Sequence, residues 1–364
     1  MPTSHGAHAA LPERSHTDPD PRRSLKHVCV HLLTPLLMCL GMALAYLGAF
    51  HQPEPHHLKV AVVGTGPQAK VLAQTVKDAA GDRLDVTTLR SSHDAQRQLL
   101  DRDLVGAFLP DATSPELLVA TANSDTSTTA AEAVFQQVTA EQGTRLKVSD
   151  LAPSAPGDPT GQGLFFLLIA LSIGSYAGVA VIGGAGAVLP MRVRALVALA
   201  ASLAISAIGI VVAGPVFHIV DHDRPAMWAI SWLYSAGILA IGTGLHTFVK
   251  RWTTLTMMVL FVMVNFTSSG GVFRPDLQNG FFGALHAFWN GAGFVEGARS
   301  LLYFDGRAGL SGNLLALALW LAAGLALLIA AGRSEQRHRG AELVSTDDDI
   351  EEEVEENMEE AVGV

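Results

Sequence analysis

The stretch GLFFLLIALSIGSYAGVAVIGGAGAVL, residues 163–189, decides the fold class of this chain. It contains no Asp, Glu, Lys or Arg over a length that exceeds the ~20 residues a helix needs to cross the hydrocarbon core of a bilayer. A buried helix of a soluble protein rarely stays uncharged for so long. We therefore predict a membrane-spanning helix here.

Similar apolar runs occur along the rest of the chain. The 364 residues are 49% hydrophobic and 16% charged, whereas soluble domains carry about 25% charged residues. The apolar runs lie at 28–50, 163–189, 195–220, 226–249, 252–272 and 312–331. The sequence therefore predicts a polytopic α-helical membrane protein with six transmembrane helices: a first helix at 28–50 and a five-helix domain at 162–332.

The distribution of Lys and Arg predicts the orientation of these helices. Lys and Arg cluster in four places: before the first run, between the second and third, between the fourth and fifth, and after the last. If every run crosses the membrane, these four places lie on the same side of it. Because such clusters remain on the cytoplasmic side, we expect a multi-pass protein of the cell (plasma) membrane with both termini cytoplasmic. A cleaved signal peptide at 22–45 is the competing interpretation, since Ala43-Leu44-Ala45 resembles a small-x-small cleavage site.

Residues 51–161 have a soluble composition, with alternating strand and helix patterns that predict a small extracytoplasmic α/β domain. We expect strands at 58–63, 84–89, 105–109, 117–122 and 146–148, and helices at 68–80, 92–101 and 128–142. The Pro- and Gly-containing segment 152–159 breaks regular structure and predicts a linker into the membrane.

Three other segments are too polar to cross a membrane. Residues 273–311 predict a re-entrant or interfacial helical segment on the outer face. Residues 1–27 have no apolar periodicity and predict a disordered cytoplasmic N-terminus. Residues 333–364 predict a disordered acidic tail, because 341–364 holds eleven acidic residues without Lys or Arg, while the whole chain has a net charge of −10.

Four polar residues are candidates for a transport pathway or another function. His246 and Asn265 fall inside predicted spans, where polar groups are costly and often functional. Glu296 and Arg299 are three residues apart, so a helix would place them on one face as a pair. Packing roles are the alternative: an interhelical hydrogen bond for Asn265, interfacial exposure for His246, and a structural ion pair for Glu296 and Arg299.

Other chemistries lack the residue patterns that they need. The chain has no paired-carboxylate, Ser/His/Asp or Cys/His arrangement and no phosphate loop for ATP, so we expect neither an enzyme nor a cofactor site. Gly64-Thr65-Gly66 follows a strand, but the acidic residue expected after the next strand is missing. The histidines and acids at 51–57 and 218–223 lack metal-ligand spacing, so we expect no metal site. No basic stripe predicts nucleic-acid binding.

Several stretches resemble the phage-infection-protein-like membrane proteins of actinobacteria, which are related to the type-2 permeases of ABC exporters. They are 84–86, 99–107, 148–161 and 298–306, in an order of one span, an outer domain and five spans. The resemblance implies export of a hydrophobic or envelope-associated substrate, with energy from a separate ATPase subunit. Such exporters dock the ATPase through an amphipathic N-terminal helix and a loop between the second and third spans, which here is only Pro190–Arg194.

The expected function is therefore that of a membrane transport or export component. Its expected partners are membrane lipid, a separate ATPase and further subunits of a homo- or hetero-oligomer, and nucleic acid is not among them. A non-transporting envelope scaffold or receptor-like membrane protein is the alternative.

Overall fold

The computed structural model describes residues 21–362, and its contacts divide the chain into residues 1–42 and residues 43–364. The sequence predicts disorder for residues 1–20 and 363–364, which lie outside the described residues. Helix α1, Pro21–Phe50, spans the division and contains Pro35. It begins within the segment 1–27 that the sequence analysis assigns to a disordered N-terminus, so the helix is longer than the apolar run alone.

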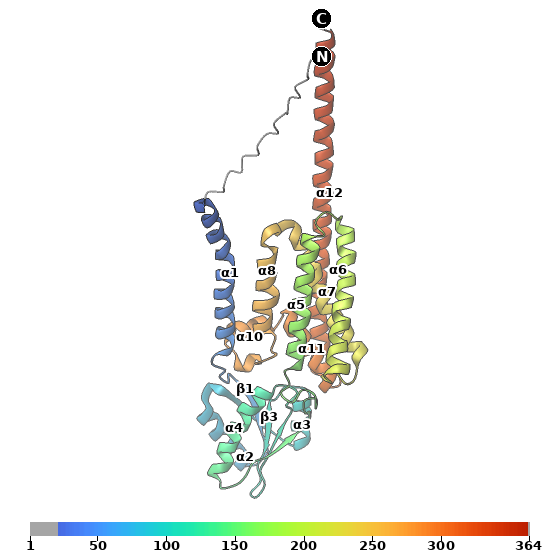
Figure 1. The fold of residues 1–364 in the computed structure, drawn as a ribbon. Helices are drawn as coiled ribbons and strands as arrows, with labels where there is room; N and C mark the ends of the chain where they lie inside the picture. Colours follow the sequence, from blue (N-terminus) through green and yellow to red (C-terminus); the bar gives the residue numbers. More distant parts are fainter. Residues whose placement is uncertain (1–20, 363–364) are drawn as a thin grey trace, which may run out of the picture. The chain divides into compact units, whose positions relative to one another are not determined.

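Residues 58–150 fold into a five-stranded sheet with three helices (Figure 1). The strands are β1 Leu58–Val63, β2 Leu84–Leu89, β3 Gly106–Leu109, β4 Glu116–Val119 and β5 Lys147–Asp150, and the helices are α2 Pro67–Ala80, α3 Ser92–Leu100 and α4 Asp125–Glu141. The sheet order is β2-β1-β3-β4-β5, and only β3 and β4 pair antiparallel. Each predicted strand and helix of this domain is present, within a few residues of its expected bounds.

Both faces of the sheet are covered by apolar side chains. The larger core packs α2 and α4 on one side and centres on Phe108 and Phe135, whose rings stack 4.9 Å apart. The smaller core packs Ala95 and Leu99 of α3 against Ala61 and Ala107. This domain therefore has its own hydrophobic interior.

The remaining helices form a bundle (Figure 1). They are α5 Gly163–Gly184, α6 Met191–Val211, α7 Arg224–Val249, α8 Thr253–Met258, α9 Asn265–Ser268, α10 Gly280–His286, α11 Asn290–Tyr303 and α12 Leu310–Val362. Helix α7 is central, because it packs against α5, α6, α11 and α12. Single π-helical turns at Val212–Val216 and Val259–Val264 extend α6 and link α8 to α9.

Within residues 21–362, five stretches are long and apolar enough to cross a membrane. They are Val28–Phe50, Gly163–Gly184, Met191–Val216, Arg224–Ser268 and Leu310–His338. The 45-residue stretch Arg224–Ser268 covers two of the six predicted spans. Lys250 interrupts it with a φ of 50°, so helix α7 ends at Val249 and a second helical arm begins at Thr253. These five stretches support a membrane protein.

Two expected boundaries differ from the structure. Helix α6 begins at Met191, four residues before the predicted third span, because Pro190 sits at its N-terminal cap position and Arg194 finds an ion-pair partner inside the bundle. Helix α12 continues to Val362 instead of giving way to a disordered tail after residue 332. Glu has a high helix propensity, and the preceding apolar helix supplies the nucleus on which these residues add turns.

Candidate functional site

Helix α11 carries the centre of a buried charged cluster. The pair Glu296 and Arg299 is formed as the helical spacing predicts, with Arg299 Nη1 donating to Glu296 Oε1 over 2.9 Å. The same nitrogen donates to the carbonyl oxygen of Gly270 over 3.0 Å. Both side chains are almost completely enclosed, with 10% and 5% of their surface exposed.

Arg102 reaches this carboxylate from the α/β domain. It follows α3 in a left-handed conformation with a φ of 62°, and its Nη2 forms an ion pair with Glu296. Its Nε donates to Asn123 Oδ1 over 2.8 Å, and its guanidinium lies 5.4 Å from the centre of the Phe304 ring. The side chain thus connects the loop after α3 to the middle of α11 and to Phe304, which follows its C-terminal end.

Two further basic side chains complete what we call the Glu296 cluster: Arg102, Arg274, His286, Glu296 and Arg299. Arg274 Nη1 lies 3.8 Å from Glu296 Oε2 and also donates to Asn123. His286 Nε2 lies 3.9 Å from Glu296 Oε1, while its Nδ1 lies 2.9 Å from the carbonyl oxygen of Ser268. One carboxylate therefore faces three guanidinium groups and one imidazole.

The electrostatics of the cluster hold Glu296 ionised. Burial alone would raise the pKa of Glu296, but the positive charges of Arg102, Arg274 and Arg299 outweigh it and place this pKa far below its usual range. Burial lowers the pKa of Arg102 to about 10, against the attraction of Glu296. Burial also lowers the pKa of His286, so this imidazole is neutral at pH 7.

Apolar and hydrogen-bonded contacts surround the cluster where the α/β domain meets the helices. Phe304 packs among Ala120, Ala122 and Ala152. Ser127 Oγ donates to Asp276 Oδ1 over 3.2 Å. The Glu296 cluster is therefore one part of a junction that also contains apolar contacts and a hydrogen bond to the carboxylate of Asp276.

Asn265 occupies a second buried polar site, inside the bundle. Its Nδ2 donates to the hydroxyl of Tyr234 over 2.6 Å, and this hydroxyl also pairs with Ser172 Oγ. Its Oδ1 accepts from the backbone N–H of Gly291 over 2.7 Å. Gly291 permits this approach, because a Cβ there would lie 2.5 Å from Oδ1. Asn265 thus links α5, α7, α9 and α11, as the packing alternative anticipates.

Other polar side chains in the bundle have no hydrogen-bond partner among the groups that the structure describes. They are the hydroxyls of Ser175, Ser231, Ser235 and Thr243 and both polar atoms of the Asn290 amide. Four of these five side chains are completely buried, and Thr243 is 1% exposed. An unpaired buried polar group costs about 1–3 kcal/mol, so this interior is suited to hold water or a polar group.

His246 lies apart from these sites, near the other end of α7. Its Nδ1 is 3.1 Å from Thr253 Oγ1, and the ring packs on Gly183, where a Cβ would lie 2.7 Å from Nδ1. His246, Lys250 and Thr253 line a small pocket of about 180 Å³. The structure therefore does not bring His246 together with Asn265, Glu296 and Arg299.

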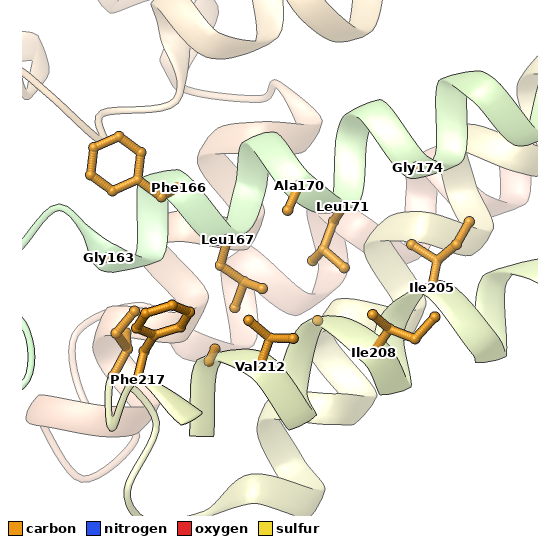
Figure 2. Close-up of a pocket in the computed structure, with 13 residues that line it drawn as sticks. Gly163, Phe166, Leu167, Ala170, Leu171, Gly174, Ile205, Ile208, Val212 and Phe217 are labelled. Carbon is orange, nitrogen blue, oxygen red and sulfur yellow. The ribbon is translucent and has the colours of Figure 1, made fainter. Parts of the chain in front are cut away.

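A groove of about 380 Å³ lies between α5 and α6 (Figure 2). Leu167 and Leu171 of α5 point toward Ile208 and Val212 of α6 across this space. Every side chain that lines the groove is apolar, and the glycines among its lining residues add space. Because Phe166, Ile208 and Phe217 are more than half exposed, the groove opens onto an apolar surface.

Sequence reasoning found the pair on α11 but missed the groups that converge on it. Arg102 is 194 residues from Glu296 along the chain, Arg274 precedes the short turn Pro275–Leu277, and His286 is the last residue of the short helix α10. The missed partners of Asn265 are Tyr234 and Ser172. Polar positions inside apolar runs could have indicated Ser172 and Tyr234, whereas no local pattern distinguishes Arg102 from an ordinary surface arginine.

Comparisons with known proteins find no match among family models, curated proteins or solved structures. Among the side chains that the structure describes, no group of three or more His, Cys, Asp or Glu lies close enough to hold a metal ion.

Proposed function

We propose that this chain is a membrane transport component that moves a hydrophobic or envelope-associated substrate out of the cell. The groove between α5 and α6 is the observation that carries this proposal. Its lining matches a lipophilic molecule, because apolar pockets bind by removing apolar surface from water or from a less complementary solvent. Its opening onto exposed apolar side chains gives such a molecule access from the bilayer.

The proposed topology has six spans, with the α/β domain outside the cell and both termini in the cytoplasm. Its support is the break at Lys250, which turns Arg224–Ser268 into two helical arms. The second arm, residues 253–268, rises about 24 Å at 1.5 Å per residue, and α10 and α11 then form the re-entrant segment. Lys and Arg beside alternate spans support the orientation.

The energy source that we propose is a separate ATPase subunit, in accordance with the resemblance to type-2 ABC permeases. The loop between α5 and α6, residues 185–190, is short. An ATPase would therefore dock mainly on other cytoplasmic surfaces, including the part of α12 beyond the proposed span. Lipid and further copies or subunits remain the proposed membrane partners.

A non-transporting scaffold or receptor is the second candidate function. The Glu296 cluster favours it, because a buried ion-pair network that fixes the α/β domain to the helices suits a static assembly. A transporter can use the same connection to move the domain together with α11, so the cluster alone does not separate the two functions.

A groove-filling variant tests transport directly. Ala170 lines the groove and is exposed, so Ala170→Trp fills the groove without displacing a packed side chain. Ala177 is exposed two turns further along α5 and does not line the groove, which makes Ala177→Trp the matched control. In a strain that lacks the native gene, we expect Ala170→Trp to lower efflux of lipophilic dyes or envelope lipids roughly tenfold, as a loss of about 1.4 kcal/mol would do.

The control variant should export at the wild-type rate. Equal efflux from Ala170→Trp and wild type would remove the groove from the pathway. Unchanged accumulation of every tested compound when the gene is deleted would contradict transport and favour the scaffold.

A further inference from the structure

The Glu296 cluster contains more buried positive charge than its protein groups neutralise. Among the side chains that the structure describes, Glu296 is the only carboxylate within ion-pair distance of Arg102, Arg274 and Arg299. With His286 neutral, two positive charges lack a carboxylate. Buried charges are normally paired, because an isolated ion loses its hydration without compensation.

Neutral oxygen atoms satisfy part of the hydrogen bonding but not the charge. Asn123 Oδ1 accepts from Arg102 and Arg274, and the carbonyl of Gly270 accepts from Arg299. Arg102 and Arg299 each expose only 5% of their side chains, so bulk water cannot screen them effectively. The cluster therefore has a net positive charge that favours binding of an anion.

Arg274 provides the point of access for that anion. It is the most exposed of the three arginines, at 20% of its side chain. Its Nε is buried and has no hydrogen-bond partner among the described residues. This nitrogen belongs to the planar fork with which arginine binds oxyanions through two parallel hydrogen bonds.

The surroundings of Arg274 favour a phosphate group. Its neighbour Phe273 contacts the ring of Phe50 at 5.8 Å, and Asn279 Nδ2 donates to the carbonyl of Gly48 over 3.0 Å. Both contacts place this segment at the end of the candidate span Val28–Phe50. The end of a membrane span lies at the depth of the lipid phosphates.

We propose that the Glu296 cluster is a binding site for a phosphate group, which Arg274 contacts directly and which neutralises the charge shared with Arg102 and Arg299. The group is the phosphate of a membrane lipid or of a free phosphate compound. This proposal depends on charge balance and not on transport, so it holds for an exporter and for a scaffold alike.

The test measures the thermal unfolding midpoint of the full-length protein in nanodiscs. One arm adds inorganic phosphate to phosphatidylcholine nanodiscs, with sodium chloride of equal ionic strength as the reference. The other arm replaces part of the phosphatidylcholine by phosphatidylglycerol. A ligand at free concentration c that binds only the folded state stabilises it by RT ln(1 + c/Kd) and therefore raises the midpoint as the ligand concentration increases.

Arg274→Gln loses a charge-assisted hydrogen bond to the phosphate. We therefore expect this variant to need about tenfold more ligand, or more, for the same rise of the unfolding midpoint. Arg97→Gln is the control, because Arg97 is exposed and pairs only with Asp94 on α3 among the described contacts. Arg274→Lys keeps the charge without the fork and should retain part of the response. It also supplies the test if the glutamine variant does not fold.

A response to inorganic phosphate supports a free phosphate compound, and a response to phosphatidylglycerol alone supports a lipid headgroup. The absence of both responses, or equal responses in wild type, Arg274→Gln and Arg274→Lys, overturns the proposal.

Discussion

The Glu296 cluster and the Asn265 site solve the same problem, a polar group removed from water, by different means. Glu296 is charged and pairs with Arg299 on its own helix and with Arg102 and Arg274 from other parts of the chain. Asn265 is neutral, and its partners are hydroxyls and backbone groups without charge. The comparison teaches that charge demands long-range partners at the domain junction, whereas a neutral amide is satisfied by adjacent helices.

The largest effect should follow from removing the shared carboxylate. Glu296→Ala leaves three guanidinium groups together without a counter-charge, and breaking a buried ion pair in this way costs about 3–5 kcal/mol. We expect a corresponding loss in the free energy of unfolding, measured with denaturant on the purified protein. A loss below about 1 kcal/mol, measured without added phosphate, would show that Glu296 is dispensable for the fold.

Arg299→Ala should have a smaller effect, because Glu296 keeps its ion pair with Arg102. The variant loses the hydrogen bonds to Glu296 and Gly270, which predicts a cost of about 2 kcal/mol for a charge-assisted contact. We expect Arg299→Ala to reduce expression and activity more than the removal of Lys26, a cation near the N-terminus. Wild-type activity and stability in Arg299→Ala would show that the pair is dispensable.

The pH dependence distinguishes His286 from Glu296. Burial lowers the pKa of folded His286, so below about pH 6.5 the unfolded chain binds a proton that the folded chain does not. Stability should therefore fall as the pH drops from 7 toward 5, by at most ~1.4 kcal/mol per pH unit. Glu296 does not change the stability between pH 7 and 5. Its pKa in the folded protein is lowered, so its contribution to stability is lost only at a pH below about 4.

His286→Gln should flatten the slope of stability against pH between 7 and 5, since the titrating group is gone. The measurement is the unfolding free energy of both proteins across this range. An identical slope in the variant would assign the pH dependence to another group.

Tyr234→Phe should have the smallest effect. The variant removes the hydroxyl that Asn265 and Ser172 share, and interhelical hydrogen bonds of this kind contribute about 0.6 kcal/mol on average and ~1.7 at most. Asn265 keeps its bonds to Gly291 and to the carbonyl of Phe261. A loss as large as that of Glu296→Ala would make the Asn265 site equal to the cluster and end the distinction between them.

The α/β domain is the part of the fold that sequence reasoning predicts best. Ser91 and Gly81 mark helix boundaries there, the first by accepting a hydrogen bond from Asp94 and the second with a φ of 59°. Alternating apolar residues define the strands. These signals are local, and the structure confirms the elements within a few residues.

The candidate site was predictable only in part. The Glu296 and Arg299 pair follows from helical spacing, but the convergence of Arg102 and Arg274 depends on how the α/β domain packs against α11. The orphaned amide of Asn290 likewise depends on packing. Long-range contacts of this kind leave no periodic pattern in the sequence.

The measurement that tests the account most directly is the accessibility of single cysteines in intact cells. In a variant with Cys29 and Cys39 replaced by serine, cysteines are introduced at Ala112, an exposed position before β4, and at Gln336, an exposed position on α12. Six spans with an outer α/β domain predict that an impermeant thiol reagent labels Ala112→Cys in intact cells and Gln336→Cys only after lysis. Labelling of Gln336→Cys in intact cells, or protection of Ala112→Cys, would contradict the proposed topology and the direction of transport built on it.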